Sequence, residues 1–242
     1  MYVAGVLLAA GRGRRLAVGV PKAFSLLGGV PLLALAAATL RDSGTVDQLI
    51  VVGPPGGADE VRQVLDSCVP GHRAVVVDGA GSRHGSLHRG LSALDRRVET
   101  VVVHDACRPL APADLVVRAV KAVHDGADLA VPVLEVTETV KELDAAGRVV
   151  RTVPRETLVR VQTPQAVRRA VLAAAHLDCP PDPDDDGLLA GAGARVVTVE
   201  GHDDAFAVVR VHDLAFAEAV LARRGGAGRP GARSPRSPHS TL

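Results

Sequence analysis

The chain opens with a short apolar segment that runs directly into a glycine-rich turn, and similar segments recur with helix-like stretches between them. The first is Val3–Ala10, and the turn AAGRGRR follows its end. Regular alternation of buried strands and helices predicts a parallel sheet, because consecutive parallel strands need a crossover, and right-handed crossovers predominate. The sequence therefore predicts an α/β fold with a mostly parallel, Rossmann-like sheet and helices on both of its faces.

The apolar segments and their spacing give the bounds of the expected elements. Strands are expected at 3–10, 48–52, 74–77, 100–104, 129–133 and 195–199. Helices are expected at 32–40, 59–69, 84–94, 112–124, 164–176 and 212–223. Hydrophobic residues make up 47% of the chain but aromatic residues only 2%, so Ala, Val and Leu must form the core. A core of this kind suits parallel strands that helices cover on both sides.

The alternation breaks at residues 134–162. Thr137–Leu143 and Arg148–Val153 are β-prone and flank the turn Asp144–Gly147, a pattern typical of a hairpin. A hairpin that leaves a parallel sheet predicts a protruding β-arm. Residues 1–224 are expected to form one catalytic domain, and the Gly-, Pro-, Ser- and Arg-rich tail 225–242 is expected to be disordered.

Charge and cysteine content exclude several classes of protein. The formal net charge is +1, so no global field attracts nucleic acid or membrane, and few aromatic residues are available to stack on bases. The three cysteines are scattered and odd in number, which fits neither a disulfide framework nor a zinc site. We expect a cytoplasmic protein whose partners are small molecules, recognised by local groups of charges.

The first candidate site is the turn after the first strand. Gly11 and Gly13 allow backbone N–H groups to approach an anion closely. Four cations lie within eleven residues of sequence: Arg12, Arg14, Arg15 and Lys22. The GxxxxGK[ST] pattern of a Walker A loop is absent. The turn therefore predicts a site for the phosphates of a nucleoside triphosphate; the alternative is an ordinary strand–loop junction with solvated arginines.

Two further candidate sites follow later strands. In DGAGSRHGSLHRGL, Asp78 ends a strand, and the N–H groups at the start of the next helix could meet a base or sugar. In VVVHDACRP, Asp105 and Arg108 lie at the carboxyl end of a strand, where open α/β sheets bind ligands. An aspartate there can hold Mg²⁺, although it could also simply cap a helix. We interpret His104 and Cys107 as packing residues.

The fourth candidate site surrounds the predicted arm. Its polar side chains are Thr137, Thr139, Lys141, Arg155 and Thr163. Hydroxyls and an arginine suit the binding of a phosphorylated polyol. The alternative is that these side chains form the solvent-exposed polar face of a hairpin and bind no ligand.

Taken in order, these motifs resemble the 2-C-methyl-D-erythritol 4-phosphate cytidylyltransferase family. The matching motifs are AAGRGRR with PK after it, GAGSRHGSLHRGL, HDACRP, VTETVK, VQTPQAV and VEG, over roughly residues 3–223. The resemblance implies the nucleotidyltransferase variant of the Rossmann-like fold, CTP and Mg²⁺. It also implies a homodimer in which the β-arm of each chain enters the partner's active site.

The resemblance also implies roles for single residues. Arg15 and Lys22 would be catalytic and would hold the triphosphate. The residues along the nucleotide would be Ala9, Ala10, Gly11, Gly13, Gly79, Ser86, Asp105 and Ala106. Asp105 would bind Mg²⁺. The residues near the acceptor, a sugar-alcohol phosphate, would be Arg108, Thr139, Arg155 and Thr163, with Thr139 and Arg155 supplied by the partner chain.

The sequence departs from the family pattern in the acceptor half of the site. After VEG the family carries a segment similar to G-R-x-x-N-x-K-V-T, in which the lysine contacts phosphate. The Asn, Lys and Thr positions of that segment are Ala205, Ala207 and Val209 here. Three hypotheses follow: transfer to methylerythritol phosphate, transfer to another polyol phosphate or phosphonate, and nucleotide binding without catalysis.

Overall fold

The computed structural model describes residues 1–11, 13, 16, 21–71, 73–177 and 193–226. Its centre is an eight-stranded sheet in which β12 pairs with β7 beside the path β10-β7-β11-β6-β1-β4-β5. The strands of this sheet are β1 (Tyr2–Leu8), β4 (Gln48–Gly53), β5 (Val75–Asp78), β6 (Val98–Asp105), β7 (Leu129–Glu135), β10 (Val159–Val161), β11 (Gln165–Arg168) and β12 (Val196–Glu200). The neighbours β6, β1, β4 and β5 are parallel, as the alternation predicts.

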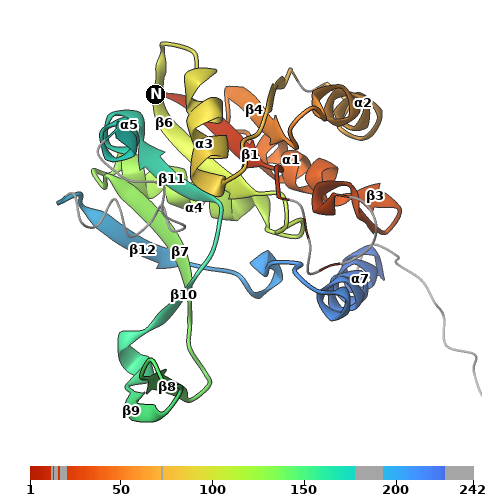
Figure 1. The fold of residues 1–242 in the computed structure, drawn as a ribbon. Helices are drawn as coiled ribbons and strands as arrows, with labels where there is room; N and C mark the ends of the chain where they lie inside the picture. The colour runs from red at the N-terminus through yellow and green to blue at the C-terminus, as the bar shows by residue number, and fades with distance from the viewer. Residues whose placement is uncertain (12, 14–15, 17–20, 72, 178–192, 227–242) are drawn as a thin grey trace, which may run out of the picture.

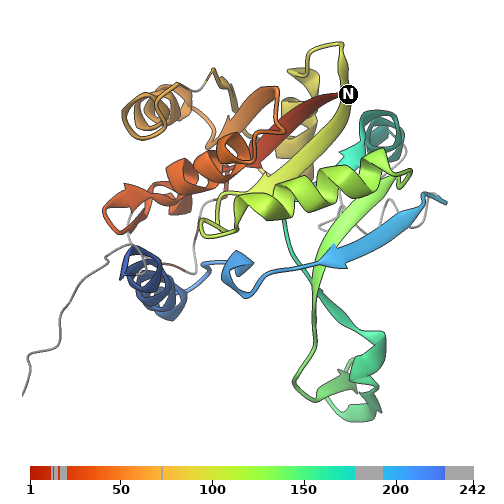
Figure 2. The same ribbon diagram turned by 180° about the vertical axis from the view of Figure 1, so that it is seen from behind.

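Helices cover both faces of the sheet (Figures 1 and 2). They are α1 (Leu32–Asp42), α2 (Ala58–Cys68), α3 (Arg83–Ser92), α4 (Ala113–His124) and α5 (Arg169–Leu177). A further helix, α7 (Val211–Gly226), ends the described part of the chain. Alternate residues of each strand point to opposite faces. Leu7 and Val51 therefore pack with α1, α2 and α4, whereas Val6 and Val52 pack with α3 and α5. This confirms the predicted fold class.

The last helix lies apart from these two layers. It packs beside the short hairpin of β2 (Leu26–Leu27) and β3 (Val30–Pro31) around a small cluster that includes Leu27 and Val220. It extends to Gly226, two residues beyond the predicted domain end at 224. The rest of the expected tail, 227–242, lies outside the described residues.

One predicted helix is wrong at its start. Residues 164–176 were expected to be helical, but the first of them form β11, an antiparallel strand between β6 and β7, before α5 begins at Arg169. The segment QAVRRAVLAA has no Gly or Pro to mark the change, so its apolar pattern fits either element. In the folded protein this segment lies between β6 and β7. A strand is favoured there because it satisfies the backbone hydrogen-bonding groups of both neighbouring strands.

The predicted arm is present and projects from the sheet (Figure 1). It is the antiparallel hairpin of β8 (Val140–Leu143) and β9 (Val149–Val153). The carboxylate of Asp144 accepts the N–H groups of Ala146 and Arg148 and so closes the turn, as the DAAG sequence predicts. A 3₁₀ turn at Arg155–Thr157 and strand β10 lead back to the sheet.

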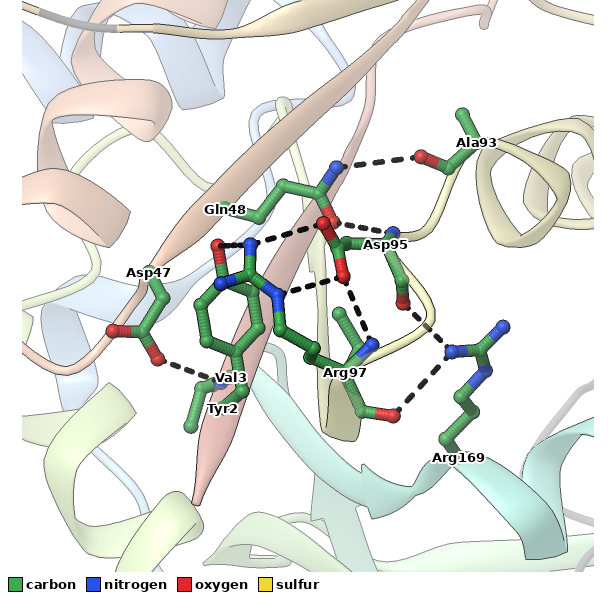
Figure 3. A network of polar contacts seen from close by, with 9 residues as sticks. Tyr2, Val3, Asp47, Gln48, Ala93, Asp95, Arg97 and Arg169 are labelled. Carbon is green, nitrogen blue, oxygen red and sulfur yellow. Dashed lines mark hydrogen bonds and ion pairs between the residues drawn. The ribbon is translucent and has the colours of Figure 1, made fainter.

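A polar network ties the elements together at the amino end of β6 (Figure 3). The Arg97 guanidinium donates to both carboxylate oxygens of Asp95, each at 3.0 Å, and lies 4.4 Å from the centre of the Tyr2 ring. The side chain of Gln48 accepts from the Asp95 N–H at 3.0 Å, and Arg169 donates to the Asp95 carbonyl at 2.7 Å. These contacts join β1, β4, β6 and α5.

None of the helices in the described part of the chain combines the length and apolarity that a membrane crossing requires.

Candidate active site

The turn after β1 begins the site. The Ala9 N–H donates to the carbonyl of Val52 at 2.8 Å, which holds the strand end in the sheet. Gly13 has a φ of +62°, and a side chain there would collide with the Cβ of Lys22. The glycine therefore lets the turn pack directly on the 3₁₀ turn η1 (Lys22–Phe24) that carries the lysine. Arg12, Arg14 and Arg15 lie outside the described residues.

The second loop follows β5. A Cβ on Gly79 would overlap the side chain of Ala10 and lie 2.5 Å from the carbonyl oxygen of Gly53, so only glycine fits. Ser82 caps α3 by accepting the Gly85 N–H at 3.0 Å. The Ser86 hydroxyl accepts the Ala80 N–H at 3.0 Å and donates to the Ser82 carbonyl at 2.7 Å, which fixes the shape of the loop.

The third loop is the carboxyl end of β6. The Ala106 N–H donates to the carbonyl of Leu8 at 3.0 Å, so this loop and the first one lie side by side. The Asp105 carboxylate lies 3.3 Å from a guanidinium nitrogen of Arg83 and 4.0 Å from Nε of Arg108. Arg83 is not among the residues that the sequence motifs predict for the site. Its signal was an arginine inside the GAGSRHGS motif, at the first residue of a helix.

The three loops enclose a cavity of about 380 Å³, a size within the usual range for small-molecule sites. The predicted residues on its wall are Ala9, Ala10, Gly11, Lys22, Ser86, Asp105 and Ala106. Gly13 and Gly79 lie behind the wall and permit its close packing. Lys22 and Asp105 therefore face one space, although they are 83 positions apart in the chain.

Two groups near Asp105, the fully buried His104 and the partly buried Cys107, are uncharged at neutral pH. Burial raises the pKa of the Cys107 thiol, which also lines the cavity, so the group is a neutral thiol beside Lys22. Burial lowers the pKa of His104 to about 4, so its ring is neutral. The neutral, fully buried ring of His104 is what a packing group would show, and the interpretation of Cys107 as a packing residue stays a prediction.

Thr163 lies beneath the third loop. Its hydroxyl oxygen accepts the Asp105 N–H at 3.1 Å and lies 3.0 Å from Nδ1 of His104. Only 3% of the residue is exposed. In this geometry Thr163 holds Asp105 in place, and its contact with an acceptor stays a prediction.

Arg108 connects the third loop to two other segments of the chain. Its guanidinium donates to the carbonyl of Ala205 at 2.7 Å and to that of Val161 at 3.2 Å. The Val208 N–H donates to the Cys107 carbonyl at 2.7 Å. The segment that departs from the family pattern, 205–209, therefore borders the loop that follows Asp105.

The structure does not bring the arm residues to the cavity of the same chain. Thr139 is exposed, and Arg155 donates to the carbonyl of Thr137 at 2.8 Å, so both belong to the arm itself. The arm projects away from the three loops (Figure 1). Within one chain, the predicted acceptor residues thus fall into two groups, Arg108 with Thr163 and Thr139 with Arg155.

Known proteins resemble this chain over most of its length. The family model of 2-C-methyl-D-erythritol 4-phosphate cytidylyltransferase matches residues 3–223. A relative of that name from Frankia casuarinae is 47% identical over 91% of this chain and 82% of its own. Another from Streptomyces avermitilis is 44% identical over 91% of this chain and 92% of its own.

Solved structures agree in fold. The crystal structure of 2-C-methyl-D-erythritol 4-phosphate cytidylyltransferase from Thermus thermophilus is 35% identical, with a TM-score of 0.73, and covers 92% of this chain and 100% of its own. That of 4-diphosphocytidyl-2C-methyl-D-erythritol synthase from Anaerococcus prevotii has a TM-score of 0.80 at 25% identity, over 92% and 99%. The chain belongs to the 2-C-methyl-D-erythritol 4-phosphate cytidylyltransferase family.

Proposed function

We propose that the protein transfers CMP from CTP to 2-C-methyl-D-erythritol 4-phosphate, with release of pyrophosphate, in the synthesis of isoprenoid precursors. The observation that carries the proposal is the cavity between three strand-end loops, which both Lys22 and Asp105 line. Membership of the family supplies the substrates. Release of pyrophosphate that needs both CTP and this acceptor tests the proposal, and no release would reject it.

The chemistry requires charge neutralisation rather than a general base. The acceptor phosphate is already an anion at neutral pH, so its oxygen can attack the α-phosphorus directly. A new P–O bond forms as the bond to pyrophosphate breaks in line, and negative charge builds on the transferring group. The Lys22 ammonium, together with Arg15 and the N–H groups near Gly11, would stabilise that charge.

A single carboxylate on the cavity wall suits Mg²⁺. This ion commonly takes one or two carboxylates and completes its coordination with substrate phosphates and water. Asp105 is that carboxylate, and among the residues that the structure describes there is no group of three or more metal-binding side chains. Mg²⁺ bound there would neutralise phosphate charge. Asp105 would orient the nucleotide, and Arg83 would exchange its carboxylate partner for phosphate oxygens.

We infer that the working form is a homodimer. The arm carries Thr139 and Arg155 away from its own cavity, and it exposes apolar side chains, with Leu143 56% and Val149 62% accessible. Exposed apolar groups on a projecting hairpin fit a surface that a second copy covers. The arm would then supply Thr139 and Arg155 to the partner's acceptor.

Complementation between two inactive variants tests this arrangement. Lys22→Ala and Arg155→Ala should each be inactive alone, because each removes one half of a shared site. In a random mixture half of the dimers are mixed and one of their two sites is intact, so about a quarter of wild-type activity should return. No recovery, with mixed dimers verified, would reject a shared site.

Two alternatives follow from Ala205, Ala207 and Val209, which border the loop of Arg108. The chain would use another polyol phosphate or a phosphonate, or it would bind CTP without turnover. A screen of methylerythritol, ribitol and glycerol phosphates and of small phosphonates separates the first from the main proposal. Calorimetric CTP binding without turnover on any acceptor supports the second.

Restoring the family lysine sharpens the choice. Ala207→Lys should raise activity on methylerythritol phosphate if the residue faces the phosphates. An unchanged rate would mean that this segment follows a different path in catalysis.

We also propose a cytoplasmic location, where the cysteines Cys68 and Cys107 remain free thiols.

A further inference from the structure

We propose that Asp204 and Arg224 are positioning residues that hold Arg108 in the acceptor half of the site. This inference rests on the proposed function, in which Arg108 meets the acceptor. Neither residue lies on the wall of the cavity, and both act through the segment that follows β12.

Asp204 is a buried charge. Only 7% of the residue is exposed, in the 3₁₀ turn η3 (Asp203–Ala205). Its carboxylate accepts from Nε and Nη2 of Arg224, at 3.1 and 2.6 Å, and from Arg223 at 3.2 Å. A buried carboxylate with this many donors fixes the turn in one orientation, because any movement leaves a desolvated charge without partners.

Arg224 extends the connection to the loop after β6. The Nη2 group that bonds Asp204 also donates to the carbonyl of Leu110 at 2.8 Å. One guanidinium at the end of α7 therefore joins η3 to the stretch that follows Arg108. The Val208 N–H adds a second connection, since it donates to the Cys107 carbonyl at 2.7 Å.

Arg108 depends on these contacts for its direction. Its Nη1 donates to the carbonyl of Ala205, the residue next to Asp204, at 2.7 Å. Its Nε is buried without a hydrogen-bond partner among the described residues and lies 4.0 Å from Asp105. If η3 shifts, the oxygen that aims the guanidinium shifts with it, while the loops after β1 and β5 have hydrogen bonds of their own and stay in place.

Two neighbours provide matched controls. Arg223 is the adjacent arginine on α7 and also bonds Asp204, but its side chain is 73% exposed and no contact with Leu110 accompanies it. Asp213 lies in the same region and accepts the N–H groups of Val209 and Arg210, so it holds the start of α7 rather than η3. Both controls alter the segment without cutting the connection to Leu110.

The test compares Asp204→Asn and Arg224→Ala with Arg223→Ala and Asp213→Asn in the full chain. Loss of hydrogen bonds to a charged group should raise the acceptor KM about tenfold or more in the first pair. The CTP KM should stay within about twofold in all four, because the loops after β1 and β5 are held by other hydrogen bonds. Amide exchange at Val208 should quicken in the first pair only, and Arg224→Lys should restore part of the acceptor affinity.

The outcomes separate the inference from the proposed function. Wild-type protein that does not turn over methylerythritol phosphate rejects the function, while the exchange at Val208 still tests the connection. If Arg224→Ala matches Arg223→Ala in both readouts, the positioning role is wrong. Equal rises in both KM values, or a lower melting temperature with unchanged KM values, would also overturn it. Arg224 is partly exposed, so its variant remains informative if Asp204→Asn does not fold.

Discussion

The two ends of β6 carry similar residues and use them differently. At the amino end, the guanidinium of Arg97 and the carboxylate of Asp95 form a bidentate ion pair within the protein (Figure 3). At the carboxyl end, Asp105 faces a cavity, and Arg83 meets it through a single longer contact of 3.3 Å. Lys22 shares that cavity.

The difference shows how to separate a stabilising charge from a functional one. The Asp95 carboxylate accepts from the backbone N–H and the guanidinium of Arg97, two residues away, so the pair can form without help from a ligand. Around Asp105, Arg83 and Arg108 approach the carboxylate and Lys22 lines the same cavity, an excess of positive charge that suits a polyanion. Removing a charge should therefore reduce catalysis at one end and stability at the other.

The largest effect is expected at Lys22. Lys22→Ala should lower kcat about 10³-fold, because the ammonium stabilises charge that develops only in the transition state. Pyrophosphate release under saturating substrates measures it. The control Lys121→Ala removes a surface ion pair with Asp125 and should leave kcat unchanged. A loss below about tenfold would mean that Lys22 is not catalytic.

The next effect compares the two aspartates directly. Asp105→Asn should reduce kcat/KM for Mg–CTP by about 10²-fold, since the amide is a poor ligand for the metal. Asp95→Asn should leave kcat/KM unchanged and lower the melting temperature. Steady-state rates over a Mg²⁺ titration and scanning calorimetry measure the pair. Equal activities of the two variants would contradict the assignment of catalysis to the carboxyl end of β6 and of stability to its amino end.

A smaller effect is expected at the glycines of the second loop. Gly79→Ala forces a methyl group against Ala10 and the Gly53 carbonyl, an overpacking that should raise the Kd for CTP about tenfold. Gly81→Ala is the matched control, because nothing lies within 4 Å of the position its Cβ would take. Calorimetric titration with CTP measures both. Equal affinities would show that the loop adjusts.

The smallest effect is expected in the pH dependence of stability, and it comes from Asp95 at the amino end of β6. Hydrogen bonds from Arg97 lower the pKa of Asp95 from its ordinary value of 3.8 to about 2. A lowered pKa in the folded state stabilises above pH 3.8, and this contribution is lost as the pH falls towards 2. The urea midpoint of the wild type should therefore fall more steeply over this range than that of Asp95→Asn. If the urea midpoints of the two proteins change in parallel with pH, the titration of Asp95 is not the cause of the loss of stability.

Local pattern predicted the elements within a few residues where the period was clear. The strand expected at 129–133 is β7 at Leu129–Glu135, and the helix expected at 112–124 is α4 at Ala113–His124. Prediction failed for β11 because four residues are too few to show a period. No local signal predicted that the Thr163 hydroxyl accepts the Asp105 N–H, because the two residues are 58 positions apart.

The sequence by itself determined the sheet with its helices, the glycine turns at its carboxyl edge, and the family, because these depend on short-range periodicity and on motifs in a fixed order. Only the tertiary structure decided which distant groups meet. It brought Lys22 and Asp105 to one cavity, paired Arg83 with Asp105, and joined Arg224 to the loop of Arg108. The physical reason is that such contacts depend on how strands align in the sheet, and that alignment minimises the free energy of the whole core rather than of any one segment.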